Sequence, residues 1–517
     1  MEKIKRLAFL LAFVIALVSF SSCSQKHKGY VPADSKIVGK IDLKAFFKQT
    51  GADMDKLLSD MEDNLGDDVE KIKDMGLDVK DPIYIFGRGK GANYTFGAVA
   101  KVDDKDKVKA WFEDNAKVEI DKEGDGFEYF AEGNTGIGLN GDALVMIVSS
   151  GDDAKKEIKK IMGKEYDGDL GDNELFGKVE DAGSFACLYA DLSIISEDIA
   201  KMLERQAPQL KGQLEDIRKM VVGIDGNCSD GICDFSYWGE SADEKVQKKI
   251  DDSMATLKEI GEKAILAVPE DAIGGLVANV DGPKLSKYLD KSLNDVKLLD
   301  ELPQEFKGMY DSFISILGGI NGNFAGYFVA PMDVMIAVES DGNSADKIAQ
   351  LINDFENFDN QGLGDEPDFA VDSAHIDTEE DPYSEYAPLD EDDSADGYDY
   401  SYNLGYDSSS SMSIEKTADG YCCDNGNGNG TKFWFGNKNG ALFFTTNESL
   451  IPSALKKADK PVPSELVSFA TSRKFMYFFN LGKVKDFSSA MDKDVKKAFN
   501  AFDEIISKIN YITFSMK

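Results

Sequence analysis

The sequence predicts an α+β fold of two tandem homologous modules, each a mainly antiparallel sheet packed with helices. Three observations support this prediction: short motifs recur at similar offsets, short apolar runs end at turn residues, and the segments between them carry apolar residues every three or four positions. The first module is expected over residues 31–263 and the second over residues 264–517. A hydrophobic content of 42% is enough to form a buried core in each.

The clearest repeat is the opening of each module. The Val-Pro-Ala-Asp of residues 31–34 reappears as the Val-Pro-Glu-Asp of residues 268–271. In both places an apolar run follows and stops at an aspartate, Asp42 or Asp281, that begins a helix-like segment. An aspartate there has a structural role as a helix N-cap, because its carboxylate accepts from the first free backbone N–H groups. We therefore interpret these repeated residues as scaffold.

Two later motifs recur in the same order. An Asn-Gly turn before a β-rich run occurs at residues 140–141 and again at residues 439–440. Residues 185–192 match residues 474–481, and each segment ends a strand and begins a helix. The larger offset of the Asn-Gly pair requires extra residues in the second module.

Helices and strands are expected between these landmarks. Apolar spacing predicts helices over 246–260 and 484–506, and a long helix after Asp191 that Pro208 and Gly212 break. Seven short runs predict strands: residues 83–86, 94–102, 143–149, 185–190, 332–338, 442–446 and 511–514. Residues 87–92 match a dinucleotide-binding glycine pattern, but a strand follows them instead of a helix. A hairpin turn is the better interpretation.

The first 22 residues have the pattern of a lipoprotein signal peptide. Lys3, Lys5 and Arg6 precede an uncharged run over residues 7–18, which is too short to span a bilayer. The Phe-Ser-Ser-Cys ending at Cys23 resembles a lipobox, which implies cleavage before Cys23 and lipid attachment to its thiol. Residues 23–30 would then form a flexible tether. An ordinary secretory signal is the alternative interpretation.

Under the usual sorting pattern, Ser24 after the anchor indicates the outer membrane. Residues 24–29 contain no acidic cluster of the kind that marks surface export, so the periplasmic face is expected. The membrane is therefore a partner through the lipid. Nucleic acid is not, because a net charge of −37 opposes binding to phosphate.

Five cysteines remain after Cys23, so at least one thiol is expected to be free. Cys228 and Cys233 flank Ser-Asp-Gly-Ile between two strand-like runs, and a disulfide across that hairpin is plausible. Two reduced thiols in a turn, or a redox pair, are the alternatives.

Residues 356–412 form an acidic insertion in a loop of the second module, with eighteen acidic residues and no Lys or Arg. Asp392, Ser394 and Asp396 have the spacing that begins a calcium loop, but Asn403 stands where a loop of this kind needs glutamate. We therefore assign no metal site and keep these three as weak candidates. Six tyrosines lie among the acids, so the segment is either a disordered spacer or a surface for glycans or basic partners.

Catalytic machinery is not apparent in the sequence. The chain has two histidines, His27 and His375, and shows no nucleophile, metal or phosphate motif. Carboxylate pairs are uninformative in a chain with 95 acidic residues. No catalytic residue and no cofactor are assigned.

A lipobox, a tether, and two modules that open on the same strand-aspartate-helix pattern together resemble the Bacteroidota lipoproteins of domain-of-unknown-function family 4836. The resemblance covers both modules and implies architecture and compartment, without an activity or ligand. The acidic insertion matches no pattern of this kind.

Three functional hypotheses follow. The first is a lipid-anchored, non-enzymatic envelope protein that binds or scaffolds an envelope protein or glycan. The second is an envelope enzyme that acts on glycans through paired carboxylates at a cleft between the modules. The third is a cation-binding acidic loop protein.

Overall fold

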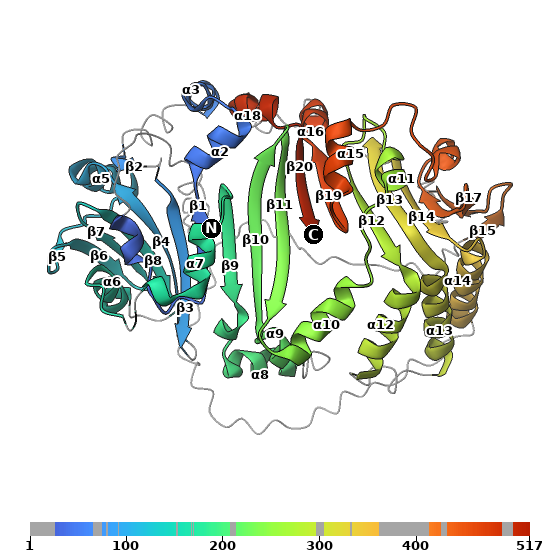
Figure 1. The fold of residues 1–517 in the computed structure, drawn as a ribbon, viewed down its shortest axis with the longest axis horizontal. Helices are drawn as coiled ribbons and strands as arrows, with labels where there is room; N and C mark the ends of the chain where they lie inside the picture. The colour runs from blue at the N-terminus through green and yellow to red at the C-terminus, as the bar shows by residue number, and fades with distance from the viewer. Residues whose placement is uncertain are drawn as a thin grey trace, which may run out of the picture.

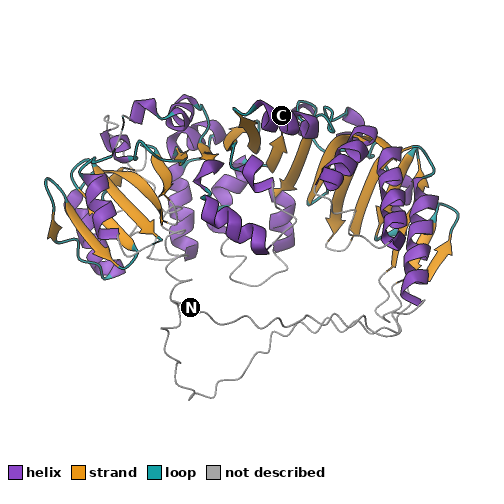
Figure 2. Cartoon of the chain, turned by 90° about the horizontal axis from the view of Figure 1, so that it is seen from below, coloured by secondary structure: helices purple, strands orange, loops and turns teal. Residues whose placement is uncertain are grey.

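In the computed structural model the chain folds around one continuous, mainly antiparallel sheet (Figure 1). The structure describes residues 26–516 except 66–74, 79–80, 91–92, 151–153, 167, 169, 207–212, 296–303, 331–332, 361–412, 425–431 and 489–499. Figure 2 shows the sheet as a long arch, with helices on both of its faces.

The strand order follows from the pairwise registers. The first half contributes, from the outer edge inward, β5 (Lys122–Glu123), β6 (Glu128–Glu132), β7 (Thr135–Leu139), β8 (Ala143–Ser149), β4 (Asn93–Val102), β3 (Ile83–Lys90), β1 (Ile37–Ile41), β9 (Ala186–Asp191), β10 (Met220–Ser229) and β11 (Ile232–Ser241). The short strand β2 (Leu77–Asp78) pairs with the end of β4.

The second half continues the sheet outward from β11. Its strands are, in order, β20 (Tyr511–Met516), β19 (Phe475–Asn480), β12 (Gly274–Asp281), β13 (Ile320–Ala330), β14 (Asp333–Ser340), β18 (Ala441–Thr445), β17 (Lys432–Lys438), β16 (Tyr421–Asp424) and β15 (Ser413–Lys416). Among the described strands, β11 and β20 form the one parallel pair, and this pair joins the two halves.

The two halves pair their strands in the same pattern. β1 lies between β3 and β9, and β12 lies between β13 and β19. The strands that precede Asp42 and Asp281 therefore occupy corresponding places in the sheet. The two Val-Pro segments also form the same turn: Ser35 N donates to Pro32 O and Ala272 N donates to Pro269 O, both at 3.1 Å.

The repeated polar residues are helix caps, as predicted. The Asp42 carboxylate accepts from Ala45 N at 2.8 Å, and the Asp281 carboxylate accepts from Lys284 N at 3.2 Å. The side chains of Asp191 and Asn480 accept in the same way from backbone N–H groups two and three residues ahead. Each cap satisfies an N–H that the first turn leaves unpaired.

Helices form two rows, one along each end of the strands (Figure 1). One row holds α2 (Leu43–Thr50), α3 (Met54–Leu65), α5 (Lys105–Trp111), α16 (Leu481–Ser488) and α18 (Asp503–Lys508). The other holds α8 (Glu197–Gln206), α9 (Gln213–Ile217), α10 (Glu244–Met254), α12 (Gly282–Asp295), α13 (Gln304–Gly319) and α14 (Ser344–Asn360).

The two largest hydrophobic cores lie on the face of the sheet opposite to the one on which α3 and α14 pack. In the first half, α6 (Ala154–Met162) and α7 (Glu174–Asp181) pack on strand residues such as Tyr84, Phe86 and Val145. In the second half, α11 (Glu262–Leu266) and α15 (Ser464–Ala470) pack on the corresponding face of β12, β13 and β19. Figure 1 shows α7 and α15 in front of the sheet.

The halves also interlock through helix α18. Ala501 is fully buried in the core of the first half, and the Glu504 carboxylate accepts from Asp53 N at 3.0 Å and from Lys56 Nζ at 2.6 Å. The hydrogen bonds from Lys56 and Asp53 hold the pKa of Glu504 below its usual value. The C-terminal segment thus fastens the second half onto the first.

The predicted strands and turns are confirmed. The seven predicted runs correspond to β3, β4, β8, β9, β14, β18 and β20, with bounds that differ by one residue at some ends. Residues 87–90 end β3, and Lys90 pairs with Asn93 at the start of β4, as a hairpin requires; residues 91–92 lie outside the described part. β10 and β11 turn at Asp230 and Gly231, whose φ angles of 51° and 76° suit a two-residue hairpin loop.

One predicted helix is too long. Helix α10 ends at Met254 instead of continuing to residue 260. Beyond it, Lys258 N donates to Asn279 O at 2.8 Å, and Asp281 N donates to Thr256 O at 2.7 Å. Pairing with the end of β12 therefore replaces the helix, although the apolar spacing continues. Of the helix predicted over 484–506, α16 and α18 are present, and residues 489–499 lie outside the described part.

The predicted flexible tether is wrong for residues 26–30, which form a short 3-10 helix, η1 (Lys26–Tyr30), packed on the first half. The His27 side chain is fully buried, and its Nε2 donates to Pro82 O at 2.8 Å. Burial of two aromatic rings, His27 and Tyr30, explains why this segment is ordered.

Several predicted features lie outside the described residues: the lipidation site Cys23, the candidates Asp392, Ser394 and Asp396, and residues 361–412 of the insertion. Helix α14 extends to Asn360, five residues into the range predicted for the insertion, and β15 begins at Ser413 as expected. The helices of the described ranges include none that is long and apolar enough to cross a membrane.

Candidate functional site

A row of exposed apolar side chains crosses the sheet between the two rows of helices. We call it the apolar stripe, and it consists of nine residues that are 36% to 48% exposed: Phe96, Val148, Leu188, Ile224, Tyr237, Ile336, Tyr477, Phe479 and Phe514. They come from β4, β8, β9, β10, β11, β14, β19 and β20. Most large apolar side chains elsewhere in the described structure are buried or half-buried, so this row is a distinct surface.

The registers place all nine side chains on one face, because directly paired residues share a face and every second residue of a strand returns to it. Phe96 pairs with Val148, Leu188 pairs with Ile224, and Ile224 pairs with Tyr237. Across the β11–β20 junction, Phe514 pairs with Tyr477. The row continues through Leu276 and Gly326 to Ile336. From β8 to β14 it is about 50 Å long at roughly 4.8 Å per strand.

This face is uncharged over its whole described length. In the twelve strands from β8 to β14, each described position on the stripe face holds an apolar residue, Gly, Ser, Cys or Tyr. Charged residues of the same strands, such as Lys40, Asp225 and Asp234, fall on the opposite face. A one-sided distribution of this kind in a chain of net charge −37 separates a neutral surface from an acidic exterior.

Glycines leave room for two of the stripe side chains to lie across neighbouring strands. A Cβ atom placed on Gly39 would lie 2.8 Å from Leu188 Cδ1, and one placed on Gly87 would lie 3.0 Å from the Phe96 ring. Leu188 and Phe96 therefore lie across the neighbouring strand, over the missing side chains. Phe235 and Phe514 stack with ring centroids 5.4 Å apart at the centre of the sheet.

Two tyrosine hydroxyls are the polar groups of the stripe. Burial raises the pKa of the Tyr237 phenol, and the nearby Tyr477 raises it further. The Tyr237 ring is therefore neutral at physiological pH, which keeps the centre of the stripe uncharged.

A buried polar cluster lies on the other side of the sheet, at the β11–β20 junction. The Asp234 carboxylate, 3% exposed, accepts from Thr513 Oγ1 at 2.7 Å, Ser515 Oγ at 2.9 Å and Ser236 Oγ at 2.5 Å. Arg473 forms an ion pair with it at 3.4 Å, and its guanidinium lies 4.4 Å from the centroid of the Phe469 ring. The cluster fixes the parallel register that makes the stripe continuous.

Cys228 and Cys233 occupy directly paired positions of the β10–β11 hairpin, with Cα atoms 4.0 Å apart, and form a disulfide. Both belong to a small core with Phe185 and Ile509. Cys187 and Cys422 are free thiols. Burial raises the pKa of Cys187, so this thiol is a poor nucleophile.

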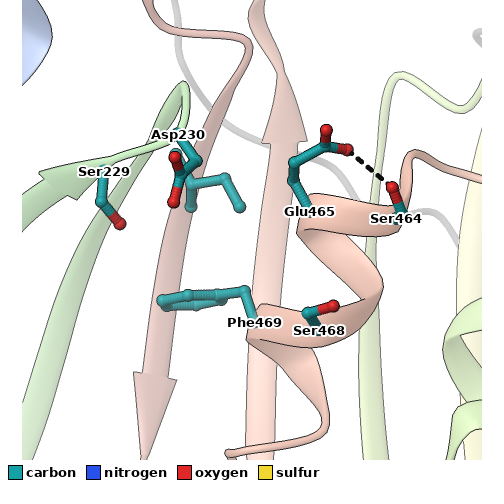
Figure 3. A pocket seen from close by; sticks show the side chains of 7 residues that line it. Ser229, Asp230, Ser464, Glu465, Ser468 and Phe469 are labelled. Atoms are coloured by element: carbon teal, nitrogen blue, oxygen red, sulfur yellow. Dashed lines mark hydrogen bonds between the residues drawn. The ribbon is translucent and has the colours of Figure 1, made fainter.

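A polar pocket of about 390 Å³ opens between the tip of the β10–β11 hairpin and helix α15. Figure 3 shows Asp230 from the hairpin and Glu465 from the helix on opposite sides of it, with the Phe469 ring between. Ser464 Oγ donates to Glu465 at 3.1 Å. Sequence reasoning missed these residues, because hairpin and helix come from different halves. Two carboxylates beside an aromatic ring could bind a sugar.

The described residues hold no cluster of three or more His, Cys, Asp or Glu side chains that could bind a metal ion.

The apolar stripe was not predicted from the sequence, although one segment of the sequence indicated it. Residues 475–479 read Phe-Met-Tyr-Phe-Phe, and a run without polar alternation indicates a strand that is apolar on both faces.

Comparison with known proteins places the chain in one family. The family described as "Domain of unknown function (DUF4836)" matches residues 29–513, which cover both halves and the acidic insertion. No curated protein and no solved structure matches the chain.

Proposed function

We propose that this chain, which belongs to the DUF4836 family, is a lipid-anchored envelope protein that binds an apolar partner on its stripe. The observation that supports this proposal is a neutral, exposed apolar row about 50 Å long at the usual strand spacing. Soluble monomers rarely leave such a surface open unless something binds there.

The proposal includes the architecture. The two halves are tandem homologous modules, and the strand order, the Val-Pro turns and the four caps support this relation. Duplication accounts for the length of the stripe, because each module supplies about half of it. The β11–β20 join then makes one surface from two.

The compartment is also part of the proposal. Residues 1–22 are a signal peptide, and Cys23 carries the lipid that holds the protein on the periplasmic face of the outer membrane. The lipobox pattern and the following Ser24 support this assignment. An anchored protein of this kind acts as a binding or scaffolding component and needs no catalytic group.

A photo-crosslinking experiment in cells tests the binding proposal. A benzoylphenylalanine in place of Tyr237, at the centre of the stripe, is expected to capture an envelope component. The same residue in place of Phe313, which is 46% exposed on helix α13, serves as the matched control and is expected to capture none. Equal yields at the two positions, or none at Tyr237, would contradict the proposal.

A second function has one observation in its favour: Asp230 and Glu465 line the same pocket. In this alternative the protein is a glycan hydrolase that uses these carboxylates as acid and base or nucleophile. The variants Asp230→Asn and Glu465→Gln would then each abolish hydrolysis of envelope glycans. Hydrolysis that persists in both variants would eliminate the alternative.

A further inference from the structure

We infer that the occupant of the apolar stripe is the acyl region of a zwitterionic envelope phospholipid. This inference rests on the proposed function and names the chemical class of the partner. It depends on three properties: the absence of free backbone hydrogen-bonding groups on the stripe, the helices at its borders, and the net negative charge of the chain.

The first property excludes ligands rich in polar groups. The strand backbones beneath the stripe are paired on both sides within the sheet, so they offer no N–H or C=O to a bound chain. An extended peptide or a glycan laid on this face would lose hydrogen bonds to water and regain few. Hydrocarbon chains carry no polar groups and lose none.

The second property excludes a second copy of the chain. Helices α3 and α14 pack on the stripe face at opposite ends of the strands, on Ala100 and Leu144 in the first half and on Val338 and Leu442 in the second. Two sheets pack about 10 Å apart, which is about the thickness of one helix layer. Face-to-face copies would bring two such layers into collision. A narrow ligand fits between the rows.

The filled positions over two glycines of the stripe face favour flexible chains over a partner helix. A helix docks by inserting ridges or anchor side chains into grooves. Leu188 and Phe96 fill the positions over Gly39 and Gly87 that would otherwise form such depressions. Acyl chains need no such depressions, because they adapt their shape to the surface that they cover.

The third property, the net negative charge, selects the headgroup. The proposed anchor adds that lipid is close to the folded protein. With a net charge of −37 the protein repels anionic headgroups, so a zwitterionic lipid such as phosphatidylethanolamine is favoured. The proposed anchor at Cys23 is three residues before the docked segment η1, and three residues span at most about 10 Å. The folded body therefore stays close to a membrane surface.

The test uses the full mature chain with Cys23→Ala, mixed with vesicles of phosphatidylethanolamine and phosphatidylcholine and then separated from them. Lipid is expected to remain bound to this protein and to a Phe313→Glu control. Ile224→Glu is expected to reduce bound lipid at least about tenfold, because a carboxylate cannot be covered by hydrocarbon without cost. Circular dichroism checks that each variant is folded.

A second measurement does not depend on variants. In the protein without substitutions in the stripe, a phospholipid with a photoreactive acyl chain is expected to label peptides of β9, β10, β19 and β20. Labelling elsewhere, equal retention of phosphatidylglycerol, or dimers that Ile224→Glu dissociates would each overturn the inference. If no phospholipid binds but crosslinking from Tyr237 in cells still captures an apolar partner, the proposed function stands and this inference fails.

Discussion

At the scale of single residues, Asp234 holds the join between the two halves. Its carboxylate accepts three hydroxyl hydrogen bonds and an ion pair in a site closed to water. Removal of this group leaves Arg473 and three hydroxyls without their partner, which is more damaging than the loss of any single bond.

Asp234→Ala is therefore expected to lower the free energy of unfolding by about 3 kcal/mol. Thr513→Val removes one hydrogen bond at constant shape and is expected to cost about 1 kcal/mol. Urea unfolding followed by tryptophan fluorescence measures both, since Trp238 lies on β11, the same strand as Asp234. Equal effects of the two variants would show that the carboxylate does not organise the cluster.

His27 gives the N-terminal segment a dependence on pH. Burial lowers the pKa of the imidazole, although the hydrogen bond to Pro82 and the nearby Asp81 act in the opposite direction. The unfolded chain takes up this proton near pH 6.5, and the folded chain takes it up only at lower pH. The stabilisation is therefore complete above about pH 6.5 and is lost as the pH falls through the lowered folded value.

Unfolding of the protein between pH 7 and pH 5 should show this loss, at most about 1.4 kcal/mol per pH unit. His27→Gln keeps a donor for Pro82 O and cannot take up a proton, so its stability should fall less over the same range. Parallel pH profiles for the two proteins would contradict the assignment.

At the scale of elements, the acidic insertion lies between helix α14 and strand β15. The corresponding connection in the first half is short, since Ala116 ends one helix and Lys122 begins β5. Eighteen like charges repel one another over the screening length of about 8 Å. The insertion is therefore expected to add no stability.

Replacement of residues 361–412 by a flexible linker of about 10 residues, which spans roughly 17 Å, is expected to leave the fold intact and the melting temperature little changed. Thermal unfolding by circular dichroism measures this. A replaced chain that fails to fold would show that the insertion belongs to a core. If the replaced chain retains as much lipid as the original chain, the insertion takes no part in binding at the stripe.

The elements themselves were largely predictable, because turns and caps are local. Asp230-Gly231 and Asn439-Gly440 adopt positive φ angles that their side chains allow, so the hairpins could be read directly. The end of α10 at Met254 could not, since distant pairing with β12 decides it. The stripe and the pocket depend on strand order and on which face the helices cover, and neither property is encoded in a local pattern.

At the scale of the whole molecule, one neutral face spans two halves joined by β11 and β20. A charge placed anywhere along this face should disturb binding without unfolding the protein, because the stripe side chains are partly exposed. The proposed lipid anchor is a separate feature of the molecule, and it is tested separately.

Cys23→Ala is expected to move the protein from the membrane fraction to the soluble fraction, since it removes the thiol that would carry the lipid. Cell fractionation with immunoblotting measures this, and Cys422→Ala is a control that keeps the anchor. Membrane association that survives both high salt and the loss of Cys23 would contradict a lipid anchor.

The most direct test of the central claim is the mass of apolar material that remains on the protein when it is isolated from the envelope. Native mass spectrometry compares the unsubstituted chain with Ile224→Glu, whose single charge lies in the middle of the stripe. We predict bound apolar ligand on the unsubstituted chain and none on the folded variant. A bare unsubstituted chain, or the same adduct on both proteins, would contradict the claim that the stripe is the binding surface.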